Sequence, residues 1–271
     1  MVPNAVPAAN PYREVPVCTI LRPCYTAPGF LVLKRLARQL PAPLYLALYR
    51  VYRKLTSSPP PQGGLIQSRG PLETDVAPRL ATIPGWFHLD DIAHFSLILG
   101  TQLANGVRGD LLEIGCYFGR SAALLAMYLQ PNEHLYLVDV FDLPNDEPYV
   151  PPTVAVVREN VYRAVPTLAR DALTLIRGDS REATLPANVE LRFVHIDGGH
   201  AAETVYSDLM LCTPHLIVGG IVAVDDYAHP ALPGVALGVQ RFLDETDSYE
   251  TLADLNRAGA AGRILYLWRS K

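Results

Sequence analysis

Apolar and polar positions follow two alternating periods along most of this chain. After about residue 84, short apolar runs of strand character recur, and each is followed by a segment whose apolar residues repeat every three or four positions. We expect strands at 110–115, 134–139, 173–179, 191–197 and 221–226, and helices at 88–104, 119–130, 153–169, 201–212 and 234–246. This alternation predicts a mostly parallel sheet flanked by helices.

The C-terminal part departs from that alternation. Two further strand-like runs, 249–255 and 263–269, are separated only by the turn-prone stretch 256–262. A connection this short joins antiparallel strands, whereas parallel strands need a longer crossover. The sequence therefore predicts an α/β fold with a Rossmann-like sheet of seven strands, the last hairpin being antiparallel.

The N-terminal region has a different pattern. Residues 1–27 are rich in proline and small residues, and two apolar, basic segments at 29–40 and 43–55 are separated by a proline-containing break. Residues 56–64 have the composition of a linker, with three consecutive prolines and two glycines. We expect a helical N-terminal extension over 1–64 and the main domain over 65–271.

Charge is divided unevenly between these regions. Residues 1–72 contain 9 Lys and Arg and one acidic residue, whereas residues 73–271 contain 14 basic and 26 acidic residues. Such a basic extension is typical of contact with an anionic membrane, a partner or a second subunit. We favour the simpler interpretation, a helical lid packed over the main domain with its arginines solvated. No nucleic-acid-binding motif accompanies the charge, so we expect no nucleic-acid partner.

Composition places the chain in the globular class. Its 271 residues are 49% hydrophobic and 18% charged, with a net charge of −4. The longest uncharged apolar stretch, 216–224, is less than half of the roughly 20 residues needed to cross a bilayer. The N-terminus lacks the pattern of a secretory signal. We expect a cytoplasmic protein whose four scattered cysteines are ordinary thiols.

The loop after the first strand distinguishes between cofactors. It carries Glu113, Gly115, Gly119 and Ser121, which is not the G-x-G-x-x-G pattern that accommodates a dinucleotide pyrophosphate. The negative charge of Glu113 repels phosphates and attracts a cation or an ammonium group. The second strand ends at Asp139, a suitable position for accepting hydrogen bonds from ribose hydroxyls. An NAD-dependent oxidoreductase is therefore disfavoured.

Acidic residues and histidine gather after the fourth and fifth strands. Asp197 and His200 follow the fourth, and Asp225 and Asp226 end the fifth. Because neighbouring parallel strands bring their carboxyl ends to one edge, these side chains are expected to converge and to need a neutralising cation. A hard divalent ion such as Mg²⁺, held by Asp197, Asp225 and Asp226, suits these oxygen ligands. The alternative is that the acids line a cofactor pocket without metal.

Histidine supplies the candidate base. His200 follows two glycines at the start of a predicted helix, and a neutral imidazole there can take a hydroxyl proton near neutral pH. We expect His200 to be the catalytic base, with Asp197 beside it. His229, in the loop after the fifth strand, is a second possible base or substrate contact, and His195 is expected to be a core residue.

Five blocks carry a family resemblance: 111–126, 135–144, 178–186, 193–200 and 219–227. From about Gly109 to Asp244 the chain resembles a class I S-adenosylmethionine-dependent methyltransferase. Within that superfamily it is similar to the enzymes related to macrocin O-methyltransferase, which modify natural-product sugars. The resemblance implies S-adenosylmethionine as cofactor, in contact with Glu113, Gly115, Tyr117, Ser121, Asp139, Asp179 and Ser180. Some relatives carry D-G-D where this chain has Gly199 followed by His200.

Together with the acidic cluster, the resemblance implies a metal-assisted O-methyltransferase acting on a hydroxyl of a sugar or glycosylated small molecule. A catechol-type phenolic O-methyltransferase would use the same residues on an aromatic diol. A protein that binds the cofactor without catalysis, docking through its basic extension, is the alternative from another class. Trp86, Phe87, Tyr149 and Tyr227 are candidate walls of the acceptor pocket.

Overall fold

The computed structural model describes residues 75–143, 150–257 and 261–271. The chain divides into two units, Met1–Ser57 and Ser58–Lys271, and all described residues belong to the second. The predicted extension over 1–64, its two helices, its possible membrane or subunit contacts and Tyr149 lie outside the described residues. Within the described ranges, no helix is long and apolar enough to cross a membrane.

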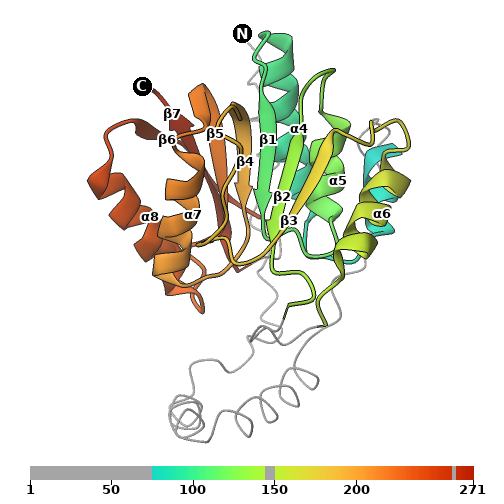
Figure 1. Ribbon diagram of the computed structural model, residues 1–271. Coiled ribbons are helices and arrows are strands. Elements are labelled where there is room, and N and C mark those ends of the chain that lie inside the picture. Colours follow the sequence, from blue (N-terminus) through green and yellow to red (C-terminus); the bar gives the residue numbers. More distant parts are fainter. Residues whose placement is uncertain (1–74, 144–149, 258–260) are drawn as a thin grey trace, which may run out of the picture. The chain divides into compact units, whose positions relative to one another are not determined.

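Seven strands form one sheet in the order β3-β2-β1-β4-β5-β7-β6 (Figure 1). The strands β1 to β5 pair in parallel, and β7 joins β5 and β6 antiparallel. Their bounds are β1 Asp110–Ile114, β2 Leu135–Asp139, β3 Leu173–Arg177, β4 Leu191–Ile196, β5 Leu216–Tyr227, β6 Tyr249–Asn256 and β7 Arg263–Arg269. The predicted seven-stranded Rossmann-like sheet with a closing hairpin is confirmed.

Helices cover both faces of this sheet (Figure 1). They are α3 Ala77–Ala81, α4 Leu89–Ala104, α5 Arg120–Met127, α6 Val154–Ala164, α7 Ala202–Cys212 and α8 Pro233–Glu245. One apolar core contains buried residues of α3 to α6, and a second contains those of α7 and α8. Because alternate residues of a strand point to opposite faces, Leu111 belongs to the first core and Leu112 to the second.

The two largest differences from the sequence-based boundaries are at the end of α6 and the start of β5. Helix α6 ends at Ala164 instead of 169, because Val165 precedes a proline and the residue before proline disfavours helical backbone. Strand β5 begins at Leu216 instead of 221. The glycine pair at 219–220 suggested a break, but the strand continues through it, with Gly219 at a φ of +85° and a register shift against β4.

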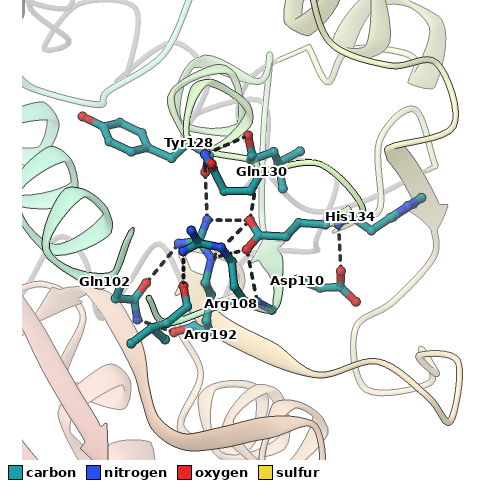
Figure 2. A network of polar contacts seen from close by, with 11 residues as sticks. Gln102, Arg108, Asp110, Tyr128, Gln130, His134 and Arg192 are labelled. Carbon is teal, nitrogen blue, oxygen red and sulfur yellow. Dashed lines mark hydrogen bonds and ion pairs between the residues drawn. The ribbon is translucent and has the colours of Figure 1, made fainter. Parts of the chain in front are cut away.

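A buried ion pair fastens the N-terminal edge of the sheet (Figure 2). Arg192 on β4 has no exposed side-chain surface, and its Nη2 lies 2.8 Å from Glu133 Oε2. The same guanidinium donates to Gln102 Oε1 of α4 and to the carbonyl of Tyr128 after α5. Glu133 also accepts the backbone N–H of Gln130. This network therefore links two strand starts and two helix ends, opposite the edge that carries the predicted site.

Two of the four cysteines are described. Cys116 and Cys212 are buried and unpaired, which agrees with their interpretation as thiols. Cys18 and Cys24 lie outside the described residues.

Candidate functional site

The predicted cofactor loop begins directly after β1. Gly115 has a φ of +83°, and a Cβ atom there would lie 2.2 Å from the backbone oxygen of Asp197. Asp197 in turn donates its backbone N–H to Ile114, at 2.8 Å. Only glycine permits both this backbone conformation and this approach. The loop after β1 and the start of the acidic cluster after β4 are thus in direct backbone contact.

Asp139 holds the loop after β1 in place. Its Oδ2 accepts the backbone N–H groups of Cys116 and Tyr117 at 2.8 and 3.0 Å, and its Oδ1 accepts that of Phe141 at 2.9 Å. These bonds stabilise the backbone of Tyr117, which has a φ of +46°. Ser121 is buried in the first turns of α5, which begins after Gly119. The structure therefore brings Gly115, Tyr117, Ser121 and Asp139 together around one loop.

Glu113 lies elsewhere. Its side chain has no exposed surface, and its Oε1 is 2.7 Å from Nδ1 of the equally buried His195. The two residues are register partners on β1 and β4, so their side chains share one face of the sheet. In this arrangement Glu113 offers no exposed surface for the expected contact with a bound molecule. His195 is a core histidine, as expected, although its Nε2 has no hydrogen-bond partner among the described residues.

Asp179 and Ser180 follow β3. Arg181 binds both carboxylate oxygens of Asp179, and its hydrogen bonds hold the pKa of Asp179 below the usual value. The Asp179 side chain keeps 36% of its surface exposed, so it remains open to contact. Ser180 is half-buried beside it.

The acidic cluster predicted after β4 and β5 is present. One ligand atom each from Asp197, His200 and Asp226 lie within 4.8 Å of one another, and His200 Nε2 is 3.5 Å from Asp226 Oδ2. Asp226 has a φ of +53°, which is uncommon for a non-glycine residue and occurs where surrounding structure fixes the backbone. These three side chains are exposed or half-buried, so solvent reaches them.

The sequence analysis did not identify Arg257 as part of this cluster. This arginine directly follows β6 and is only 7% exposed. Its Nη1 lies 3.0 Å from Asp225 Oδ2, and its Nη2 lies 2.5 Å from Asp225 Oδ1. Its Nη1 is also 3.5 Å from Asp91 of α4. The protein thus supplies a guanidinium beside Asp225, a counter-charge that the sequence-based argument for a cation did not include. The only sequence signal was a basic residue at a strand end.

Asp197 and Asp226 are still subject to repulsion from neighbouring carboxylates in the presence of Arg257. Crowding by protein atoms, followed by the charges of Asp225 and Asp226, raises the pKa of Asp197 well above its usual value. Burial and the charge of Asp225 likewise raise the pKa of Asp226. These raised pKa values reflect, in part, repulsion between neighbouring carboxylates. A cation bound beside Asp197 and Asp226 would reduce that repulsion.

The chemistry of this donor set fits a divalent cation in part. Asp197 and Asp226 offer hard carboxylate oxygens beside an imidazole, within reach of solvent. A second group, formed by His195, Asp197 and Asp225, also meets the distance requirement. In that group His195 is fully buried and bonded to Glu113, and Asp225 is bonded to Arg257.

His229 lies near Asp226, and Trp86 lies beside the loop after β1. The Nδ1 atom of His229 accepts the backbone N–H of Ala231 at 3.1 Å, so this ring is engaged in its own loop. Trp86 is 52% exposed, and its ring lies 5.0 Å from that of Tyr117 in the loop after β1. Arg120 holds the segment before Trp86 by donating to the carbonyl of Ile83 at 2.6 Å.

Comparisons with known proteins agree with this geometry. Residues 112–227 match the family model of a methyltransferase domain. A search of curated protein sequences found no match. Among solved structures, the chain is similar to the O-methyltransferase NovP, with 18% identity and a TM-score of 0.58, over 85% of this chain and 100% of that one.

Two further solved structures share the fold. CalS11, a TDP-rhamnose 3'-O-methyltransferase of calicheamicin biosynthesis, is 21% identical with a TM-score of 0.50, over 74% of this chain and 96% of that one. An O-methyltransferase from Bacillus cereus in complex with SAH is 15% identical with a TM-score of 0.50, over 82% and 97% of the two chains. Residues 112–227 therefore match a methyltransferase domain, and the chain shares its Rossmann-like fold with these O-methyltransferases.

Proposed function

We propose that the protein transfers the methyl group of S-adenosylmethionine to a hydroxyl of a sugar or glycosylated small molecule. The observation that supports this most directly is the backbone contact between the loop after β1 and the cluster of Asp197, His200 and Asp226. A cofactor bound over that loop would lie beside a cluster of carboxylates and an imidazole. Methyl transfer to oxygen needs such a neighbour, because the hydroxyl proton must leave.

The cofactor is proposed to bind along the ends of β1, β2 and β3. Gly115 and Tyr117 form the loop on which it rests, and Ser121 lies in the adjoining helix. Asp139 is proposed to accept hydrogen bonds from the ribose hydroxyls. Asp179 and Ser180, at the next strand end, are proposed to lie near the adenine. Of the predicted contacts, Glu113 is the one that this arrangement supports least, because it is buried against His195.

His200 is proposed to take the proton. Its Nε2 faces Asp226 Oδ2 at 3.5 Å, and this carboxylate stabilises the imidazolium that forms when the proton arrives. Bound S-adenosylmethionine would supply the methyl group to the acceptor oxygen, and S-adenosylhomocysteine would be the leaving group. A divalent cation, which we propose to be Mg²⁺, supplies positive charge for the developing alkoxide when it is bound. Asp197 and Asp226 are the residues with free carboxylate surface to hold it.

The proposal that the acceptor is a sugar is supported by fewer observations. CalS11 is a TDP-rhamnose O-methyltransferase, and its fold is similar to that of this chain. The half-exposed ring of Trp86, fixed beside the cofactor loop, adds an apolar surface of the kind that packs against the face of a sugar ring. An aromatic diol would use the same surface, so acceptor screening has to include both classes.

Binding and turnover are tested separately. Calorimetric titration with S-adenosylhomocysteine is expected to show binding to the full-length protein. Release of S-adenosylhomocysteine from S-adenosylmethionine is then measured with a panel of sugar nucleotides, glycosides and catechols. We expect turnover with a glycoside or sugar nucleotide, and a loss of at least roughly 100-fold in kcat in H200A, the usual contribution of a general base.

His134→Gln is the matched control. His134 lies at the opposite edge of the sheet, bonded to Thr174, so its substitution is expected to leave kcat unchanged. Binding without turnover on any acceptor would favour a cofactor-binding protein without catalysis. Full turnover in H200A would exclude His200 as the base, and no binding of S-adenosylhomocysteine would refute the proposed function.

A further inference from the structure

Arg257 is a buried cation among three carboxylates that come from different parts of the fold. Asp91 belongs to the first turn of α4, whereas Asp225 and Asp226 end β5. The guanidinium lies within 3.5 Å of all three. Because a buried charge without a counter-charge costs several kcal/mol, these groups depend on each other for their burial.

The carboxylate of Asp225 has its oxygens committed. Its Oδ1 accepts the backbone N–H of Asp226 at 2.5 Å and faces Arg257 Nη2, and its Oδ2 accepts from Arg257 Nη1. The side chain is 8% exposed. A cation coordinated by Asp225 would have to displace a bidentate guanidinium pair from a nearly buried position.

Asp226 is in the opposite situation. Arg257 reaches only its Oδ1, at 3.4 Å, while its Oδ2 faces His200. The side chain of Asp226 is 28% exposed, and Asp197 beside it is exposed. The positive φ of Asp226 turns the backbone between the two consecutive acids. The pair Asp225–Asp226 is therefore split between an internal cation and the solvent-facing cluster.

We propose that Arg257 divides the acidic cluster into two parts with different roles. In the closed part, Arg257 neutralises Asp225 and Asp91 permanently. In the open part, Asp197 and Asp226 hold the divalent cation, and His200 keeps its imidazole for the proton of the acceptor. Arg257 is thus a positioning residue, and Asp225 is not a metal ligand. This inference rests on the proposed metal-assisted function.

The closed part also explains why the other group of possible ligands is unsuitable. His195 has no exposed surface, and its Nδ1 already contacts Glu113. A cation at His195 and Asp225 would be enclosed beside the guanidinium of Arg257, whose charge repels it.

A charge-balanced double variant tests this division. D225N/R257Q removes one negative and one positive charge together, so the net charge near Asp197 and Asp226 is unchanged. D226N removes a proposed ligand. Mn²⁺ serves as the probe, because its free ion is quantified by electron paramagnetic resonance and it takes the same oxygen ligands as Mg²⁺. Binding is measured on the full-length protein, and circular dichroism establishes that each variant is folded.

We expect wild type to bind Mn²⁺, D225N/R257Q to keep its affinity to within roughly tenfold, and D226N to lose at least roughly 100-fold, because outer-shell changes already cost about 10–100-fold. If the double variant does not fold, D225N alone is compared with D226N, with the same order expected. Equal losses in D225N and D226N, measured on folded protein, would overturn the division.

Calorimetry with S-adenosylhomocysteine separates the two proposals. Absence of Mn²⁺ binding by wild type, with intact S-adenosylhomocysteine binding, would refute the open metal site while leaving the methyltransferase function standing. Absence of both would refute the proposed function as well.

Discussion

The ion pair of Arg192 and Glu133 gives the sharpest stability prediction. Both side chains are nearly inaccessible, at 0% and 5% exposure, and their Nη2–Oε2 distance is 2.8 Å. Replacing Glu133 with Gln leaves the guanidinium without a counter-charge, with neutral acceptors in its place: Gln102, the Tyr128 carbonyl and the introduced amide oxygen. Breaking a buried pair in this way costs about 3–5 kcal/mol. Because native stability is only about 5–15 kcal/mol, E133Q should lose a large part of it.

The double variant E133Q/R192M distinguishes pairing from simple packing. It leaves no unpaired charge, so its loss of stability should be smaller than the sum of the two single losses by roughly 2 kcal/mol or more. Urea unfolding with linear extrapolation measures each free energy of unfolding, and the midpoint of thermal unfolding of E133Q should fall by roughly 6–20 °C. The exposed pair of Lys271 and Asp247 is the control, and D247N should leave the free energy of unfolding almost unchanged.

Two results would refute this reasoning. One is a loss in E133Q no larger than that in D247N, and the other is strict additivity in the double variant. Since the network lies at the starts of the parallel strands and the site at their ends, folded E133Q is expected to bind S-adenosylhomocysteine with unchanged affinity.

Three further predictions concern the site and its surroundings. Gly115→Ala should abolish S-adenosylhomocysteine binding in calorimetry, since its Cβ would lie 2.2 Å from a backbone oxygen at a φ of +83°; retained affinity would show that the loop after β1 is not the binding surface. If the cofactor rests against Tyr117, S-adenosylhomocysteine should change the emission of the stacked Trp86, so the change should vanish in W86F and persist in W268F. Burial raises the pKa of Asp208 to about 7. The folded protein therefore favours the protonated side chain, so the contribution of Asp208 to stability is present below about pH 4 and is lost as the pH rises to about 7. D208N should therefore exceed wild type in stability at pH 8 by an amount on the order of 4 kcal/mol and match it near pH 4, as measured by urea unfolding; parallel pH profiles would contradict the raised pKa.

Much of this arrangement follows from the sequence because it depends on strand order. Parallel strands place their carboxyl ends at one edge, and β4 and β5 are neighbours, so Asp197, His200 and Asp226 converge as predicted. The hairpin of β6 and β7 was likewise predictable, because 256–262 is too short for a parallel crossover.

The roles of individual acids were less predictable. Consecutive residues on a strand point to opposite faces, but the sequence does not say which of Asp225 and Asp226 faces the protein interior. Glu113 faces His195 because the two are register partners, and that register includes an irregularity at the start of β1 that no local pattern reports. The sequence therefore indicates which acids gather at the edge and leaves their division open.

The contact of Arg257 with the acids could not be predicted from the sequence, for a different reason. Its contact with Asp225 spans 32 positions and crosses β7, which lies between β5 and β6 in the sheet. Its position depends on the pairing register of β6 with β7, which contains a shift near Thr251 and Ala253. A one-residue slip in that register would turn successive side chains to the other face. No pattern within the strand determines whether an arginine at its end reaches the acids or solvent.

The internal cation changes what the acidic cluster implies. Without Arg257, three carboxylates at one edge would argue for a metal on repulsion alone. With Asp225 neutralised, that argument applies only to Asp197 and Asp226, whose pKa values remain raised. Two carboxylates facing solvent beside an imidazole leave most positions around an octahedral cation for water or an acceptor oxygen. Under the proposed function, a metal held by fewer protein ligands would bind more weakly but would admit an acceptor hydroxyl beside His200.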